Sequence, residues 1–133
     1  MKEGIQMDKG FSHCLQIFPV SDLNKTANYY VTIGFRAVYY LESLQPHVCL
    51  YRDNIEIILT KSKNNFIVPN RECHGYGYDA YFVTGNQKEI QDEFIKLGVK
   101  IVLPLSTTDY NNNEFVFEDI DRRWIAVGKK NKI

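Results

Sequence analysis

The stretch that decides the fold is IFPVSDLNKTANYYVTIGF, residues 17–35. It begins with an apolar run, which predicts a strand, and continues with Ser21 and Asp22, residue types suited to capping a helix. Apolar residues then recur at the spacing of one helix face, at Leu23, Ala27, Tyr30 and Val31. Gly34 stands where a left-handed C-terminal cap is expected. The stretch therefore predicts a strand followed by a helix over about 22–33.

Three strand-like segments follow this helix, at residues 35–41, 48–52 and 55–61. The last two are separated only by Asp53 and Asn54, which favour a tight turn. The first half of the chain thus predicts the element order β-α-β-β-β.

The same order returns in the second half. A strand-like segment at 78–84 precedes Asn86 and Glu89, whose spacing is close to that of a capping box. An apolar helical stripe then runs through Ile90, Phe94 and Leu97 and ends at Gly98. Because strand-like segments follow at 100–103, 114–118 and 123–128, this half also predicts β-α-β-β-β.

The spacing of the two halves indicates a repeat. Val20 and Val83, which end the strands before the helices, lie 63 positions apart, and the capping residues Gly34 and Gly98 lie 64 apart. A strand, helix and cap repeated at a nearly constant offset indicates two copies of one supersecondary unit. We therefore expect two modules, at about 11–62 and 77–130, joined by a connection at about 63–76.

Composition limits the classes of protein that fit. A chain of 133 residues is expected to form one domain, over 1–133. Sixteen basic and sixteen acidic residues give a net charge of zero, and no basic run exceeds two residues, so no nucleic acid is expected as a partner. No apolar stretch approaches the roughly 20 residues that span a bilayer, and the polar segment 1–10 lacks the apolar stretch typical of a signal peptide. We therefore expect a cytoplasmic protein with no membrane partner.

The order and spacing of these segments resemble the glyoxalase/bleomycin resistance protein/dioxygenase superfamily, also called the vicinal oxygen chelate superfamily. Three motifs carry the resemblance in the first half: Val20-Ser21-Asp22-Leu23, Tyr29-Tyr30 and Ile33-Gly34-Phe35. Two longer stretches carry it in the second half: YFVTGNQKEIQDEFIKLGV at 81–99 and EFVFEDIDRRWIAV at 114–127. The resemblance implies an α+β fold in which two β-α-β-β-β modules pair into a curled mixed sheet around a cleft.

The closing hairpin departs from the superfamily's pattern. The family commonly has D-P-D-G-N there, whereas this chain has DIDRR at 119–123. Arg122 stands in the place of the glycine. If the turn keeps a positive φ at Arg122, its side chain makes that conformation cost of order 1 kcal/mol, so we expect either this strain or a turn of altered shape.

The resemblance also identifies where metal-using members of the superfamily hold a divalent cation. Those members place His or Glu side chains on strands that face the cleft. The corresponding positions in this chain are Leu15, Glu56, Tyr78 and Ala126. Because only Glu56 is a ligand-type residue, we expect no metal and no other cofactor. A shifted register offers one alternative set of ligands, His13, His74 and Glu118.

The expected cleft is aromatic. If Ala126 faces the cleft, the alternation of side chains along a strand places Trp124 there too, and the same rule applied to the fifth strand selects Tyr78 and Phe82. The predicted ligand-binding residues are Trp124, Tyr78, Phe82, Tyr51 and Glu56. Rings of this kind stack on planar groups, and the carboxylate is suited to a cationic group. Alternatively, these rings pack a dimer interface or a second core.

Three functions are compatible with these residues. The first is a metal-free protein similar to the bleomycin resistance proteins, which sequesters a small molecule in a cleft at a homodimer interface and has no catalytic residue. The second is an enzyme of the same superfamily, a metal-dependent lyase, dioxygenase or thiol transferase with displaced ligands. The third is a structural or regulatory dimer without a small ligand. The fold alone does not choose among them.

Overall fold

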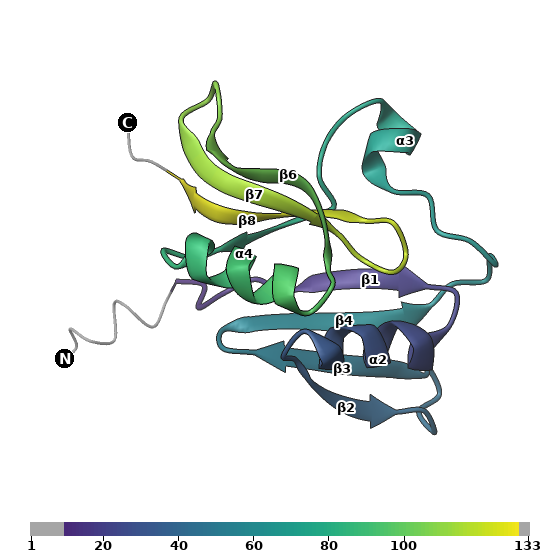
Figure 1. Cartoon of the computed structure of the whole chain (residues 1–133). Coiled ribbons are helices and arrows are strands. Elements are labelled where there is room, and N and C mark those ends of the chain that lie inside the picture. The colour runs from purple at the N-terminus through teal and green to yellow at the C-terminus, as the bar shows by residue number, and fades with distance from the viewer. Residues whose placement is uncertain (1–9, 131–133) are drawn as a thin grey trace.

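The fold consists of two four-stranded sheets, each accompanied by one ten-residue helix (Figure 1). The computed structural model describes residues 10–130. In chain order the elements are β1 (Gln16–Val20), α2 (Leu23–Thr32), β2 (Arg36–Tyr40), β3 (His47–Arg52), β4 (Ile55–Lys61), α3 (Asn70–His74), β5 (Ala80–Val83), α4 (Gln87–Lys96), β6 (Lys100–Thr107), β7 (Asn112–Glu118) and β8 (Trp124–Lys130). The predicted α+β architecture of two β-α-β-β-β modules is confirmed.

Both sheets are mixed and have equivalent strand orders, β1-β4-β3-β2 and β5-β8-β7-β6. In each sheet the first and last strands of a module pair in parallel, and the remaining neighbours pair antiparallel. No strand pairing joins the two sheets within residues 10–130. The short helix α3 stands apart in the connection between them (Figure 1). Among the described residues, no helix is long and apolar enough to cross a membrane.

The helix ends show which local signals determine the structure. Asp22 caps α2 by accepting a hydrogen bond of 3.0 Å from the Lys25 amide, as predicted. Gly34 and Gly98 both have positive φ, 97° and 80°, so both predicted glycine caps are confirmed. The predicted capping box at the start of α4 is wrong, because the Asn86 side chain makes no capping hydrogen bond.

One strand is longer than predicted, and one helix was not predicted. Strand β6 continues to Thr107, past Pro104, although the sequence indicated an end at Leu103. This strand lies at the edge of its sheet, where a proline is tolerated because the missing N–H faces away from the neighbouring strand. Helix α3 was not predicted, since its five residues include none that is buried and so carry no apolar periodicity.

One hydrophobic core is built from one face of each sheet and from both long helices. From the first module it contains Phe18, Val20, Leu23, Ala27, Tyr30, Ile33, Phe35, Val48, Leu50, Ile57 and Leu59. From the second it contains Ala80, Phe82, Phe94, Val99, Phe115, Phe117, Ile125 and Val127. We call the sheet faces that carry these residues the inner faces. Because side chains alternate along a strand, the residues between them lie on the opposite, outer faces.

The turn between β7 and β8 bonds the second module to the first. Asp119 accepts a hydrogen bond of 2.6 Å from the Tyr30 hydroxyl and forms an ion pair of 3.1 Å with Arg123. The side chains of Asp119 and Arg123 are 0% and 3% exposed. Arg123 also donates to the Pro19 carbonyl and lies 4.4 Å above the Phe18 ring. These polar contacts fix how the turn sits on helix α2 and strand β1.

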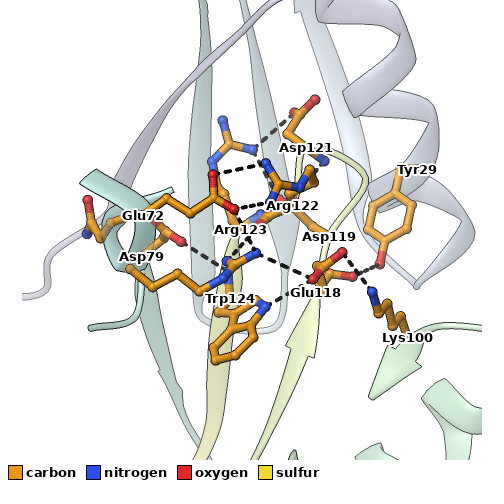
Figure 2. Close-up of polar contacts among 12 residues, drawn as sticks. Tyr29, Glu72, Asp79, Lys100, Glu118, Asp119, Asp121, Arg122, Arg123 and Trp124 are labelled. Carbon is orange, nitrogen blue, oxygen red and sulfur yellow. Dashed lines mark hydrogen bonds and ion pairs between the residues drawn. The ribbon is translucent and has the colours of Figure 1, made fainter. Parts of the chain in front are cut away.

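The same turn keeps the strained conformation at the position that is a glycine in the superfamily pattern. Arg122 has a φ of 70°. Its side chain forms an ion pair with Glu72 on α3, and its carbonyl oxygen accepts a hydrogen bond of 2.7 Å from Arg71 (Figure 2). These contacts offset a conformational cost of about 1 kcal/mol and attach α3 to the second module.

Candidate functional site

The outer face of the first sheet is apolar in the middle and polar at both ends. The strand register sets its side chains in three rows: Arg36, Tyr51 and Glu56; Val38, Cys49, Ile58 and Ile17; and Tyr40, His47, Thr60 and Pro19. The Arg36 guanidinium lies 4.8 Å above the Tyr51 ring, and the Tyr40 ring stacks on His47. The pKa of Tyr51 is raised, chiefly by the adjacent Cys49 side chain, with a smaller contribution from Glu56.

The outer face of the second sheet repeats this pattern. Its rows are Lys100, Glu118 and Trp124; Leu103, Val116, Ala126 and Tyr81; and Ser106, Glu114, Gly128 and Val83. In the middle row, which we call the apolar floor, Val116 and Ala126 are 1% and 0% exposed and so are covered by the chain itself, while Leu103 is 44% exposed. A carboxylate lies at each end of this floor, Glu114 at one and Glu118 at the other. We call this surface the second outer face, and its two ends differ in charge.

At the Trp124 end, the carboxylate is surrounded by donors. Glu118 accepts hydrogen bonds of 3.0 Å from Trp124 Nε1 and 3.3 Å from Lys100 Nζ (Figure 2). Arg71 lies 3.6 Å from the same carboxylate, and its guanidinium covers the Trp124 ring at 4.2 Å. Burial alone raises the pKa of Glu118, but the bonds from Trp124 and Lys100 outweigh it and hold that pKa below its ordinary value. The charge of Glu118 is therefore compensated by cations of the chain itself.

Helix α3 is held against the Trp124 end by polar contacts. Asp79 accepts hydrogen bonds from the backbone amides of Asn70 on α3 and of Trp124 on β8, at 2.9 and 3.0 Å. The side-chain amide of Asn70 donates to the Tyr78 carbonyl at 3.1 Å. Figure 2 shows Asp79, Glu118 and Trp124 close together below the turn that carries Arg122. These contacts position the Arg71 side chain over the Trp124 ring.

At the other end, the carboxylate is held only by phenols. Glu114 is 3% exposed and accepts hydrogen bonds of 3.0 Å from Tyr81 and 2.8 Å from Tyr110. Burial raises the pKa of Tyr81 to about 12, and the bond to Glu114 adds to the shift. Burial, with Tyr78 and Glu114 nearby, also raises the pKa of Tyr110. Both phenols therefore remain neutral hydrogen-bond donors near neutral pH.

Gly128 leaves the room that Glu114 needs. A Cβ atom at Gly128 would lie 2.5 Å from the Asn113 carbonyl oxygen and 2.6 Å from the Glu114 Cβ. Both distances are too short for any side chain. The backbone of β7 thus approaches β8 closely because position 128 is a glycine.

The structure places the predicted ligand-binding residues in two groups. Trp124 lies on the second outer face, while Tyr51 and Glu56 lie on the outer face of the first sheet. Tyr78 precedes β5 and is half-buried, and burial together with Glu114 raises its pKa. Within residues 10–130, no hydrogen bond, ion pair or aromatic contact joins the pair Tyr51 and Glu56 to Trp124.

The placement of Phe82 on the cleft face is wrong. Phe82 lies on the inner face, 8% exposed, with its ring 6.4 Å from those of Phe35 and Phe117. Its neighbour Tyr81 takes the outer position, in register with Ala126. The alternation was assigned from Tyr78, but β5 begins only at Ala80, so the strand rule does not extend back to Tyr78.

Phe82 instead borders a separate cavity between the modules. This cavity has a volume of about 270 Å³. Its walls come from the β3–β4 turn, strand β5 and helix α4, and include Phe35, Arg52, Ile55, Phe82, Ile90 and Phe94. The Arg52 guanidinium is already bonded there to the Ile33 carbonyl and to Glu93, at 2.8 and 2.9 Å. The cavity therefore lies where the two modules meet in the core, and not on either outer face.

The residues at the superfamily's metal positions do not fit a divalent cation. Leu15 and Ala126 have no donor atom, and the Tyr78 phenol has a raised pKa, which disfavours the ionised form that a metal prefers. Within the described part of the chain, no group of three His, Cys, Asp or Glu side chains could hold a metal ion. The alternative ligands His13, His74 and Glu118 are therefore not brought together. No step through a metal follows from these residues.

Three solved structures that resemble this chain over nearly its whole length show its fold. A bleomycin resistance determinant encoded on the transposon Tn5 has a TM-score of 0.71 at 12% identity, over 92% of this chain and 100% of that one. A Glyoxalase/bleomycin resistance protein/dioxygenase superfamily member from Sphaerobacter thermophilus has a TM-score of 0.68 at 17% identity, over 90% and 98%. The fosfomycin resistance protein FosX from Listeria monocytogenes has a TM-score of 0.66 at 17% identity, over 92% and 94%.

These likenesses identify the fold. The chain has the fold of the glyoxalase/bleomycin resistance protein/dioxygenase superfamily, so the resemblance in its sequence is confirmed at that level. No protein-family model and no curated protein matches the sequence. Because one fold hosts several activities, function has to be inferred from this chain's own residues.

Proposed function

We propose that this protein binds a planar or cationic small molecule on the second outer face without a divalent metal. The observation that carries the proposal is the apolar middle row, in which Leu103 is 44% exposed, between the ring of Trp124 and the carboxylate of Glu114. Aromatic rings stack on flat groups and attract cations, and carboxylates hold cationic groups by charge-assisted hydrogen bonds. This combination supports recognition of a ligand that has a flat part and a charged part.

The proposed set of ligand-binding residues keeps Trp124, Tyr78, Tyr51 and Glu56 and replaces Phe82 by Tyr81. Two of them, Tyr51 and Glu56, lie on the other sheet. They reach the same ligand if the first outer face of one copy covers the second outer face of its partner. The proposal therefore includes a symmetric homodimer with a shared cleft.

Exposed apolar residues on the first sheet support this dimer. Ile17 and Tyr40 belong to its outer face and are 60% and 46% exposed. These two residues lie on the two edge strands of the face, where a partner copy could cover both. Light scattering behind a sizing column should give twice the 15.5 kDa chain mass. Ile17→Glu should lower the mass to that of a monomer, while Ile95→Glu, at a helix position 55% exposed, should not. A monomer of the unaltered chain at tens of micromolar would remove the shared cleft.

The donor set favours binding over the enzyme alternative. A metal-dependent lyase, dioxygenase or thiol transferase needs three or four ligands that converge on one ion. The described residues offer no such group. The bleomycin resistance determinant among the matching structures makes bleomycin a reasonable first compound to try.

Fluorescence of Trp124 tests the proposal, because it is the chain's single tryptophan. We would titrate the protein with a panel of planar cationic compounds that includes bleomycin and ethidium. At least one should change the Trp124 emission saturably at one molecule per chain. Leu103→Arg, on the same face at a position 44% exposed, should weaken that binding by placing a positive charge beside the ligand, whereas Ile95→Arg, at a helix position 55% exposed, should retain it. If no compound changes the emission, or if Leu103→Arg leaves the affinity unchanged, the proposal fails.

A further inference from the structure

We propose that Glu114, with the hydroxyl groups of Tyr81 and Tyr110, forms a subsite for a primary ammonium or guanidinium group. This inference rests on the ligand-binding function proposed above, and it assigns where the positive charge of the ligand lies. The three side chains come from β7, from β5 and from the turn between β6 and β7. They meet at the end of the second outer face that is farther from Trp124.

The first observation is a buried charge without a cation. Glu114 is 3% exposed, nearly the same as Asp119 at 4%. Asp119 is paired with Arg123, whereas Glu114 has no Lys, Arg or His nitrogen within ion-pair distance in residues 10–130. A buried carboxylate is costly unless an opposite charge compensates it. Since the described chain supplies no such charge, a bound cation would compensate the Glu114 carboxylate.

The second observation is unused hydrogen-bonding capacity. A carboxylate offers about four acceptor positions, and the bonds from Tyr81 and Tyr110 use one on each oxygen of Glu114. Both phenols stay neutral, since burial raises their pKa values. The cluster therefore keeps about two free acceptor positions. An ammonium or guanidinium group donates two or more N–H bonds, and its charge is also attracted by the faces of tyrosine rings.

The third observation is access. Tyr110 is 54% exposed, although its hydroxyl reaches Oε2 of the buried Glu114. The carboxylate thus lies directly behind a side chain that borders the solvent. In the proposed subsite the cation enters beside the Tyr110 ring, whose movement exposes Oε2.

The opposite end of the face shows why the cation belongs at Glu114. Glu118 lies four residues farther along the same strand face, about 13 Å away at the usual rise per residue. It is already balanced by Lys100 and Arg71. A ligand that places its cation at Glu114 can therefore extend its flat part past the half-exposed Leu103 toward Trp124.

NMR titration with phenethylammonium tests the subsite, with 2-phenylethanol as the uncharged analogue. The amide signals of Tyr81 and Tyr110 should shift saturably with the amine and not with the alcohol. Glu114→Gln keeps the shape and accepts from one phenol, while its amide NH2 donates to the other phenol oxygen, so its fold should remain, as its amide spectrum and thermal unfolding will show. It should bind the amine at least tenfold more weakly. Asp92→Asn removes the same charge from the surface of α4 and should bind normally.

Several outcomes would overturn this assignment. Equal binding of the alcohol, or unchanged affinity in Glu114→Gln, would mean that the carboxylate does not hold the cation. If Glu118→Gln loses binding and Glu114→Gln binds normally, the cation lies at Glu118 and not at Glu114. No shift up to the solubility of the amine would also reject the subsite. If a compound of the panel still changes Trp124 emission in that case, the binding function stands and only the subsite fails.

Discussion

The guanidinium of Arg71 lies 4.2 Å above the ring of Trp124. Arg71 comes from α3, a helix with no buried residue, yet its side chain is only 16% exposed because it packs on this ring. A residue of the connection thus covers the surface that a flat or cationic ligand would contact. A cation–π contact is worth roughly 0.5–2 kcal/mol, which a bound ligand can replace.

Removing this cover should expose the tryptophan. In Arg71→Ala, Trp124 should be quenched more strongly by acrylamide and should emit at longer wavelength than in the unaltered chain. Arg36→Ala is the matched control, since Arg36 covers Tyr51 on the other sheet in the same way. It should leave both properties unchanged. Identical quenching in Arg71→Ala and the unaltered chain would show that the guanidinium does not shield the ring.

Trp124 emission should also report the charge of Glu118. The folded pKa of Glu118 is below the ordinary value of 4.5, so its stabilising contribution is present above that pH and is lost as pH falls through the folded pKa. Protonation weakens the bond from Trp124 Nε1 and releases Arg71. Emission should therefore change in a step below pH 4.5, measured before acid unfolding sets in. The step should be absent in Glu118→Gln, and a step above 4.5 would contradict the assignment.

The buried pair of Asp119 and Arg123 should dominate the stability of the join between the modules. Asp119→Ala leaves the Arg123 guanidinium buried and removes the partner of the Tyr30 hydroxyl. We expect it to lower the free energy of unfolding by about 3–5 kcal/mol. Asp92→Asn, at an exposed ion pair, should change it by less than about 0.5 kcal/mol. Urea unfolding measures both, and comparable small losses would mean that the pair does not join the modules.

The two glycines Gly128 and Gly85 should respond oppositely to an added methyl group. In Gly128→Ala the new Cβ collides with the β7 backbone, so a loss of about 1–3 kcal/mol is expected. Nothing lies within 4 Å of a Cβ at Gly85, so Gly85→Ala should be neutral or slightly stabilising. Thermal unfolding of the two variants compares them directly. Equal stability would show that β7 and β8 can separate at no cost.

Most of the fold could be predicted because its signals are local. The Asp22 cap, the glycine ends and the apolar stripes each act within a few residues, and the turn at Asp53 and Asn54 is equally short. The side-chain cap at Asn86 failed because a spacing alone does not ensure that the hydrogen bond forms. Helix α3 was not predicted because it is held by long-range polar contacts, such as that between Arg122 and Glu72, which no local pattern indicates.

The site was less predictable because it depends on which way each strand faces. The alternation in 114–118 places Glu114, Val116 and Glu118 on one side, so the two carboxylates could have been found from the sequence. Strand β5 gave no such signal, since Tyr81 and Phe82 are both aromatic and either could face the core. The bonds of Glu114 to Tyr81 and Tyr110 and the cover by Arg71 arise only from the tertiary structure.

The most direct test of ligand binding without metal is a pair of fluorescence titrations. The protein is dialysed against EDTA, its metal content is checked by elemental analysis, and a planar cation that binds at Trp124 is titrated with and without added Mn²⁺, Ni²⁺ or Zn²⁺. We expect the same affinity and one site per chain in every case. Binding that disappears after EDTA and returns with one of these ions, or a stoichiometric metal lost in His13→Ala or His74→Ala, would contradict the proposal.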